Sequence, residues 1–166
     1  MADINQWFDS IDKDRSGTLD VKELQAALAL GNLVFSLKTV AHMVRIHDPD
    51  RSGTINFQEF GALHAFLMNM QASFKYFDRD RSNSLDKQET FQALSHAGYR
   101  LDGPAFEALF KAYDPDHDNV MGLPEYIAMT LVLQSAAKTF QAFDSQRTGR
   151  ISLGWDQWIY AVANTV

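Results

Sequence analysis

A twelve-residue stretch near the amino terminus carries oxygen donors in the pattern that a divalent cation requires. It runs from Asp12 to Glu23, with donors at its first, third, fifth, ninth and twelfth residues and Gly17 at the sixth. Ca²⁺ takes six to eight oxygen ligands, and a sharp turn at the sixth residue folds such a loop around the ion. The predicted ligands are the side chains of Asp12, Asp14, Ser16 and Glu23 and the backbone carbonyl of Thr18, with a water held by Asp20. An acidic, solvated loop is the alternative, which the specificity of the motif disfavours.

The pattern returns in three more loops, at residues 48–59, 78–89 and 114–125. Their predicted ligands are Asp48, Asp50, Ser52, Thr54 and Glu59 in the second loop, Asp78, Asp80, Ser82, Ser84 and Glu89 in the third, and Asp114, Asp116, Asp118, Val120 and Glu125 in the fourth. Asn83 and Asn119 replace the turn glycine in the third and fourth loops. Asn is the residue best able, after Gly, to adopt the left-handed conformation, so the turn is expected to survive.

The fourth loop is weaker than the first three, and a fifth copy is degenerate. Gly122 stands at the ninth residue of the fourth loop, where water must serve as the ligand. The fifth copy, residues 144–155, keeps the turn glycine Gly149 and the strand residue Ile151, but Trp155 stands where the bidentate Glu should be. One carboxylate carries too little charge for a divalent ion, so we expect no Ca²⁺ there.

The spacing of the loops predicts the helices. The first residues of the five loops fall at 12, 48, 78, 114 and 144, so the steps alternate between 36 and 30. The longer step has room for an exiting helix, a connector and an entering helix. The shorter step has room for one continuous helix of about 27 Å, shared by two hands, where a hand is a loop with its two flanking helices. Eight helices are therefore expected, at residues 2–11, 21–30, 38–47, 57–77, 87–97, 104–113, 124–143 and 153–164.

Length and composition agree with one domain, or with two tightly joined lobes, over residues 1–166. Apolar residues make up 46% of the chain and aromatic residues 12%, enough for a substantial core, and the absence of cysteine excludes disulfides. The net charge of −6 argues against nucleic acid as a partner. No secretory signal and no apolar run of membrane-spanning length occurs. We expect a soluble cytoplasmic protein, peripheral to membranes when loaded with calcium.

Neighbouring loops should pair through their central residues, and the fifth loop has no neighbour. The expected pairs are Leu19 with Ile55 and Leu85 with Met121. Ile151 is left without a mate, beside an apolar helix that contains Trp155 and Trp158. An exposed strand edge next to an apolar surface favours association unless something covers it. We therefore predict a two-fold homodimer through the fifth hand, with Ile151 and Trp158 in the interface.

The chain as a whole resembles the penta-EF-hand family, and within it the apoptosis-linked group of the programmed-cell-death-6 type. The segments that carry the resemblance are Asp12 to Gly17, Lys87 to Glu89, Gly98 to Leu101, Val132 to Gln134 and Trp155 to Trp158. The resemblance implies an all-α fold of about eight helices in five helix-loop-helix units. It implies pairing of hands 1 with 2 and 3 with 4, and dimerisation through hand 5. It also implies a calcium-dependent adaptor for Pro-rich segments of membrane-traffic or cell-death proteins.

The sequence departs from this family pattern in three ways. It begins at the first hand, without the Gly/Pro-rich extension of the family, and its second and fourth hands keep ligands that are usually degraded in this group. Met70 takes the place of an aromatic residue of the family's peptide pocket, and Trp155 takes the place of its Tyr. A different peptide specificity is the expected consequence.

Three functions are compatible with these features. In a sensor, the twelfth-residue Glu moves in to chelate Ca²⁺ and pulls the exiting helix, which opens an apolar groove. The candidate partner-binding residues are Met68, Met70, Phe74 and Trp155. The alternative for these four is ordinary core, because apolar residues at helical spacing are usually buried. The other two functions are a calcium buffer and a regulatory subunit of a larger enzyme.

No feature of the sequence indicates an enzyme. A nucleophile paired with a base and a Gly-rich phosphate loop are both missing from it. The histidines show no metal-ligand spacing and are expected at the surface; they are His42, His47, His64, His96 and His117.

Overall fold

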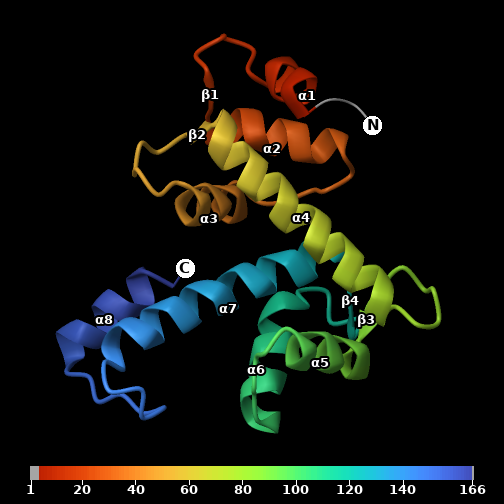
Figure 1. Ribbon diagram of the computed structural model, residues 1–166. Coiled ribbons are helices and arrows are strands. Elements are labelled where there is room, and N and C mark those ends of the chain that lie inside the picture. Colours follow the sequence, from red (N-terminus) through yellow and green to blue (C-terminus); the bar gives the residue numbers. More distant parts are fainter. Residues whose placement is uncertain (1–3, 166) are drawn as a thin grey trace.

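The computed structural model describes residues 4–165, which form eight helices and two short antiparallel ribbons (Figure 1). The helices are α1 (Ile4–Ile11), α2 (Val21–Leu30), α3 (Leu37–His47), α4 (Phe57–Phe77), α5 (Lys87–His96), α6 (Gly103–Tyr113), α7 (Leu123–Phe143) and α8 (Trp155–Ala163). The strands are β1 (Thr18–Leu19), β2 (Ile55–Asn56), β3 (Leu85–Asp86) and β4 (Val120–Met121). The all-α class and the two uninterrupted long helices are confirmed. The first residues of the expected helix 2–11 lie outside the described part.

The helices that leave the first three loops begin where a side chain caps them. Asp20, Asn56 and Asp86 each accept a hydrogen bond from the backbone N–H three residues later. The Glu at that later residue accepts one in return from the capping residue's own N–H. This reciprocal capping box satisfies N–H groups that a helix leaves free at its start. In these three loops the ninth and twelfth residues therefore also start the helix that follows.

Two pairs of hands lie along α4, one at each end. Figure 1 shows hands 1 and 2 around the first half of α4 and hands 3 and 4 around its second half, with α7 leading from the second pair towards α8. Within each pair the ribbons form in the predicted register, with Leu19 opposite Ile55 and Leu85 opposite Met121. In the described part of the chain no strand pairs with the fifth loop.

Each pair of hands has its own apolar core, and α7 contributes to both. The first core contains Leu19, Ile55 and Phe60, together with Ile127 and Leu131 from α7. The second core is built from hands 3 and 4, and its buried residues are Phe74, Phe77, Leu85, Ala93, Leu94, Phe106, Phe110, Met121, Tyr126, Met129 and Leu133. The long helix α7 therefore binds the two pairs of hands into one body.

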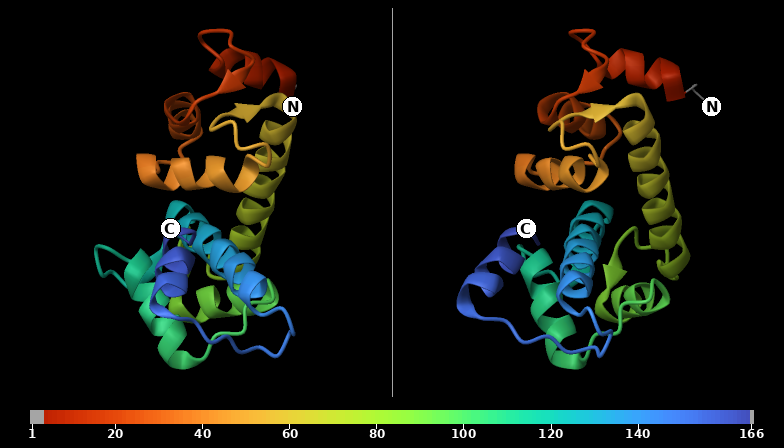
Figure 2. Two further views of the ribbon diagram at one scale, coloured as in Figure 1. Left: turned by 90° about the vertical axis from the view of Figure 1, so that its left-hand side faces the viewer. Right: turned by 60° about the vertical axis from the view of Figure 1, so that its left-hand side comes forward.

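A buried histidine joins α3 to α7, contrary to the expectation that all histidines lie at the surface. His42 is buried, and its Nε2 lies 2.7 Å from the Ser135 hydroxyl. Helices α3 and α7 contact each other, and Figure 2 shows α3, in orange, beside α7, in cyan to blue. Burial, with smaller effects from Arg45 and Lys38, lowers the pKa of His42 to about 4, so the ring stays neutral. The sequence pattern gave no sign of this contact because the two residues lie on distant segments.

Candidate metal centres

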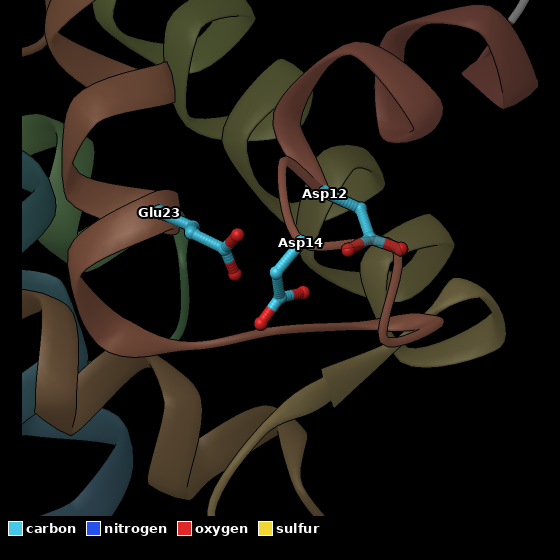
Figure 3. A group of neighbouring side chains, drawn as sticks. All are labelled: Asp12, Asp14 and Glu23. Atoms are coloured by element: carbon cyan, nitrogen blue, oxygen red, sulfur yellow. The ribbon is translucent and has the colours of Figure 1, made fainter.

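The carboxylates of the first loop converge on one point. Figure 3 shows Asp12 and Asp14 on the loop and Glu23 at the start of α2, with their oxygens turned towards a common space. One carboxylate oxygen from each lies within 4.8 Å of the other two. The Glu23 carboxylate also accepts hydrogen bonds from the N–H groups of Lys13, at 3.2 Å, and Asp20, at 3.0 Å. It is thus fixed across both ends of the loop.

The second and third loops repeat this arrangement. Oxygens of Asp48, Asp50 and Glu59 lie within 4.8 Å of one another, as do oxygens of Asp78, Asp80 and Glu89. All the charged donors are carboxylates, without Cys or His, and hard oxygen ligands of this kind suit Ca²⁺. The donor set of these three loops therefore fits Ca²⁺.

The loops turn as the predicted ligands require. In every loop the first Asp accepts hydrogen bonds from the backbone N–H groups of the fifth and sixth residues; in the first loop these are Ser16, at 2.9 Å, and Gly17, at 2.8 Å. Burial by itself raises the pKa of Asp12, but these N–H groups outweigh it and hold the pKa below its ordinary value. The carboxylate is therefore ionised at neutral pH, as a cation site needs.

The sixth residue of each loop is left-handed, including the two asparagines. Asn83 has φ +63° and Asn119 has φ +64°, close to Gly17 at +80°. The fourth residue is left-handed too, as in Arg15 at +57° and His117 at +59°, which the sequence analysis did not anticipate. Non-glycine residues tolerate this conformation only at some cost, which the hydrogen bonds to the first Asp offset.

The fourth loop differs from the others at its last ligand. Asp114, Asp116 and Asp118 form a carboxylate group within 4.8 Å, and Glu125 lies outside it. Glu125 accepts a 2.7 Å hydrogen bond from the N–H of Gly122, the same capping bond that Glu23, Glu59 and Glu89 accept in the first three loops. Burial raises the pKa of Glu125, with the three aspartates adding to the rise and the Gly122 bond opposing it. The fourth site is thus partly assembled, and Glu125 is the predicted ligand that remains apart.

The fifth loop keeps its turn but not its ligands. Asp144 accepts bonds from Thr148 and Gly149 as in the other loops, and no carboxylate group of three forms around it in the described residues. The helix that follows starts two residues later than in the other hands, because its cap is Gly154 and the side chain that returns to the cap is that of Gln157. Gln157 therefore occupies the position that the bidentate Glu has in the other hands. The prediction that Trp155 stands at this position is wrong.

The four predicted partner-binding residues are not equally accessible. Met68 is 52% exposed and Trp155 is 74% exposed. Met70 is half-buried between the two cores, and Phe74 is a buried member of the second core. Phe74 is therefore ordinary core in this structure, and the exposed residues of the predicted set are Met68 and Trp155.

A hollow of about 480 Å³ adjoins Met68, and the sequence analysis missed most of its lining. Its apolar wall comes from α1, from α2 and the connector after it, from α4 and from the start of α7, and it includes Trp7, Leu28, Leu33, Leu67, Leu123 and Pro124. These residues lie on four separate segments, so no local sequence signal groups them.

Comparison with known proteins agrees with the geometry. The family model described as an EF-hand domain pair matches residues 1–63 and 67–131. Human sorcin is 32% identical over 153 residues, covering 89% of this chain and 76% of sorcin. Zebrafish peflin is 34% identical over 156 residues, covering 93% of this chain and 58% of peflin. The chain thus spans less than two thirds of the peflins that it matches.

A solved structure is also similar over nearly the whole chain. It is a homolog of programmed cell death 6 protein from Leishmania major Friedlin, with a TM-score of 0.76 and 30% identity, covering 99% of this chain and 94% of that one. None of the helices in the described residues is both long and apolar enough to span a membrane. Five hands, four acidic loops and these relatives together place the chain in the penta-EF-hand family of calcium-binding proteins.

Proposed function

We propose that this protein is a calcium sensor and adaptor, which offers an apolar site to partner proteins when its loops are loaded. The observation that supports this most is the position of Glu125, apart from its carboxylate group and within the first turn of α7. The first three loops already have their Glu in place, so the fourth is where loading requires movement. Affinities in the sensor range, about 10⁻⁷ to 10⁻⁵ M, are expected for the better loops.

Movement of Glu125 would be transmitted by α7 itself. Bound Ca²⁺ supplies positive charge that offsets the repulsion among Asp114, Asp116 and Asp118. When Glu125 joins these residues, the start of α7 shifts with it, because Glu125 lies in the first turn of that helix. Leu123 and Pro124, in this first turn, line the hollow beside Met68, so its shape changes with the fourth loop.

The partner proposed for this surface is a Pro-rich segment of a membrane-traffic or cell-death protein. Pro-rich segments dock on grooves lined by aromatic and apolar side chains, because their extended helix loses little entropy on binding. Trp7 and Met68 supply such a lining here, and methionine adapts its shape to varied partners. The similarity to the Leishmania homolog of programmed cell death 6 protein supports the same class of function. The cytoplasm is the expected compartment.

The proposed assembly is a homodimer through the fifth hand. All residues of α8 except Ala161 are exposed, among them Trp155, Trp158 and Ile159. A helix that exposes so many large apolar side chains favours burial against another surface. A second copy that presents the same unpaired loop buries the exposed apolar side chains of α8 and supplies a partner for the strand edge at Ile151.

A hydrophobic-dye titration separates a sensor from a buffer. We expect dye fluorescence to rise when Ca²⁺ is added to the wild-type protein, and most of that rise to be lost in Glu125→Gln. The matched control is Glu107→Gln, an exposed glutamate paired with Lys87 outside the loops. No gain of dye binding in the wild type favours a calcium buffer. Copurification with a partner of different mass favours the regulatory-subunit alternative.

A further inference from the structure

A groove of about 1050 Å³ lies between hand 2 and the C-terminal part of the chain. One wall comes from α3, loop 2 and the first residue of α2, and the other comes from the second half of α7 and from α8. Figure 1 shows α3 above the half of α7 that leads to α8. Within residues 4–165 the groove shares no lining residue with the hollow beside Met68, so it is a second, separate surface.

The groove is formed by one face of α3 and one face of α7. The two helices are joined at the buried contact between His42 and Ser135, which fixes their relative position. On each helix the lining residues recur at intervals of three or four positions, which places them on a single face. They include Ala41, Val44 and Arg45 on α3 and Ser135, Lys138 and Ala142 on α7.

The groove is cationic, although the chain carries a net charge of −6. Among the described residues that line it, Arg45, Arg51 and Lys138 are cationic and Asp48 has the one carboxylate. That carboxylate is turned into its own loop, where it accepts hydrogen bonds from two backbone N–H groups at 2.9 and 2.8 Å. Arg51 and Lys138 are exposed. The excess of positive charge suits a ligand that carries carboxylates.

The rest of the lining suits a peptide. Val44 and Phe143 supply apolar surface, and the Phe143 ring meets the ring of Tyr160 with their centroids 6.3 Å apart. Gln134 and Asn164 carry amides, which can donate to and accept from a peptide backbone. A nucleic acid would need a longer cationic surface, because its binding depends on many phosphate contacts.

The groove remains accessible in the proposed homodimer. Tyr160 and Asn164 line it from α8. With about 3.6 residues per helical turn, these two residues lie on the opposite side of α8 from Trp155 and Trp158. The apolar side of α8 can therefore face a second copy while its other side faces the groove.

We propose that this groove binds an acidic peptide segment of a partner protein. Carboxylates of the peptide would pair with Lys138 and Arg51, and its apolar side chains would lie on Val44 and Phe143. Asp48 is also a predicted Ca²⁺ ligand, so the negative charge that opposes the peptide is smallest when loop 2 is loaded. This binding goes beyond the proposed docking of Pro-rich segments and depends on different residues.

Selection from a phage library of random short peptides tests what the groove prefers. The library is selected in Ca²⁺ on the wild type, on Ala142→Trp, which fills the groove, and on the control Ala72→Trp, at an exposed position of α4. Peptides kept by the wild type and the control but lost with Ala142→Trp should be richer in Asp and Glu than the library. No such enrichment overturns the proposal.

Fluorescence anisotropy with one labelled peptide from that set tests the role of charge. Lys138→Glu should weaken binding roughly tenfold or more, because an attractive charge pair becomes repulsive. The matched control is Lys75→Glu, which makes the same change of net charge at an exposed lysine of the other long helix, α4. It should bind as the wild type does. Equal weakening in the two variants overturns the proposal, because the attraction is then a property of the whole chain.

Sedimentation tests whether a second copy fills the groove instead. Ala142→Trp and the wild type should show the same degree of association at equal concentration, since the groove wall lies away from Trp158. Loss of association in Ala142→Trp alone overturns the proposal, because the occupant is then a second copy.

Discussion

At the scale of single residues, the first Asp of each loop has two tasks that the structure separates. It fixes the turn through two backbone N–H groups, and in the first four loops it is a predicted ligand of the cation. The fifth loop keeps the first task at Asp144 while lacking a carboxylate group of three among the described residues. The turn therefore depends on the first Asp, whereas the negative charge that a cation needs depends on further carboxylates. The fifth loop keeps the turn without that charge.

The third loop provides a direct test of the ligand assignment. Glu89→Gln should remove one Ca²⁺ from the stoichiometry measured by calorimetry, because a neutral amide replaces the carboxylate that completes the group with Asp78 and Asp80. The capping bond to Asp86 can be kept by the amide oxygen, so the fold is expected to stay intact. Unchanged stoichiometry in this variant would count against the assignment.

Gly122 offers a substitution that should strengthen Ca²⁺ binding rather than remove it. It caps α7 without a side chain, whereas Asp20 and Asp86 cap α2 and α5 with theirs. An added Cβ would meet its nearest neighbours, Glu125 Oε2 and Pro124 Cδ, at 3.5 and 3.7 Å, which are ordinary contacts. Gly122→Asp should therefore tighten Ca²⁺ binding in the fourth loop and raise the free energy of unfolding by about a few tenths of a kcal/mol. Calorimetry and denaturant titration measure the two effects, and weaker binding would contradict the first.

At the scale of elements, the contact between α3 and α7 holds hand 2 against the second long helix. Ser135→Ala should lower the free energy of unfolding by about 1–2 kcal/mol, since the buried His42 ring loses its partner. Ser95→Ala, on the exposed face of α5, is the control and should change it by less than about 0.5 kcal/mol. Equal effects in the two variants would show that the His42 bond contributes nothing.

The same contact predicts a pH dependence. The pKa of His42 is lowered from 6.5 to about 4 by folding, so the unfolded chain binds a proton at acid pH that the folded protein excludes. Its contribution to stability is fully present above pH 6.5 and is lost as the pH falls from there towards 4. His42→Gln should flatten the curve of unfolding free energy in this range, measured in chelator so that Ca²⁺ binding does not interfere. A curve as steep as that of the wild type would refute this.

At the scale of the whole molecule, the odd number of hands leaves one without a partner. We expect a dimer in sedimentation at tens of micromolar for the wild type and a monomer for Trp158→Glu, because the charge would be buried in the interface. Tyr76→Glu places the same charge at another exposed aromatic and should leave the dimer intact. A monomeric wild type would contradict the assembly proposed here.

The repeating units of this protein could be predicted from its amino-acid sequence. Oxygen donors at fixed spacing, asparagines able to take the left-handed turn, and steps of 36 and 30 residues fixed the loops, the long helices and the pairing of Leu19 with Ile55. These features are local or periodic, and local backbone chemistry is enough to specify them.

How these units pack against one another could be learned from the three-dimensional structure and not from the sequence. It placed Phe74 in the second core, joined His42 to Ser135, brought the lining of the Met68 hollow together from four segments, and left Glu125 apart from its group. It also showed that α8 begins late, so that Gln157 takes the place predicted for Trp155. Each of these depends on contacts between residues far apart in the chain or, for α8, on which residue caps the helix, and a pattern of residue types along the chain does not contain that information.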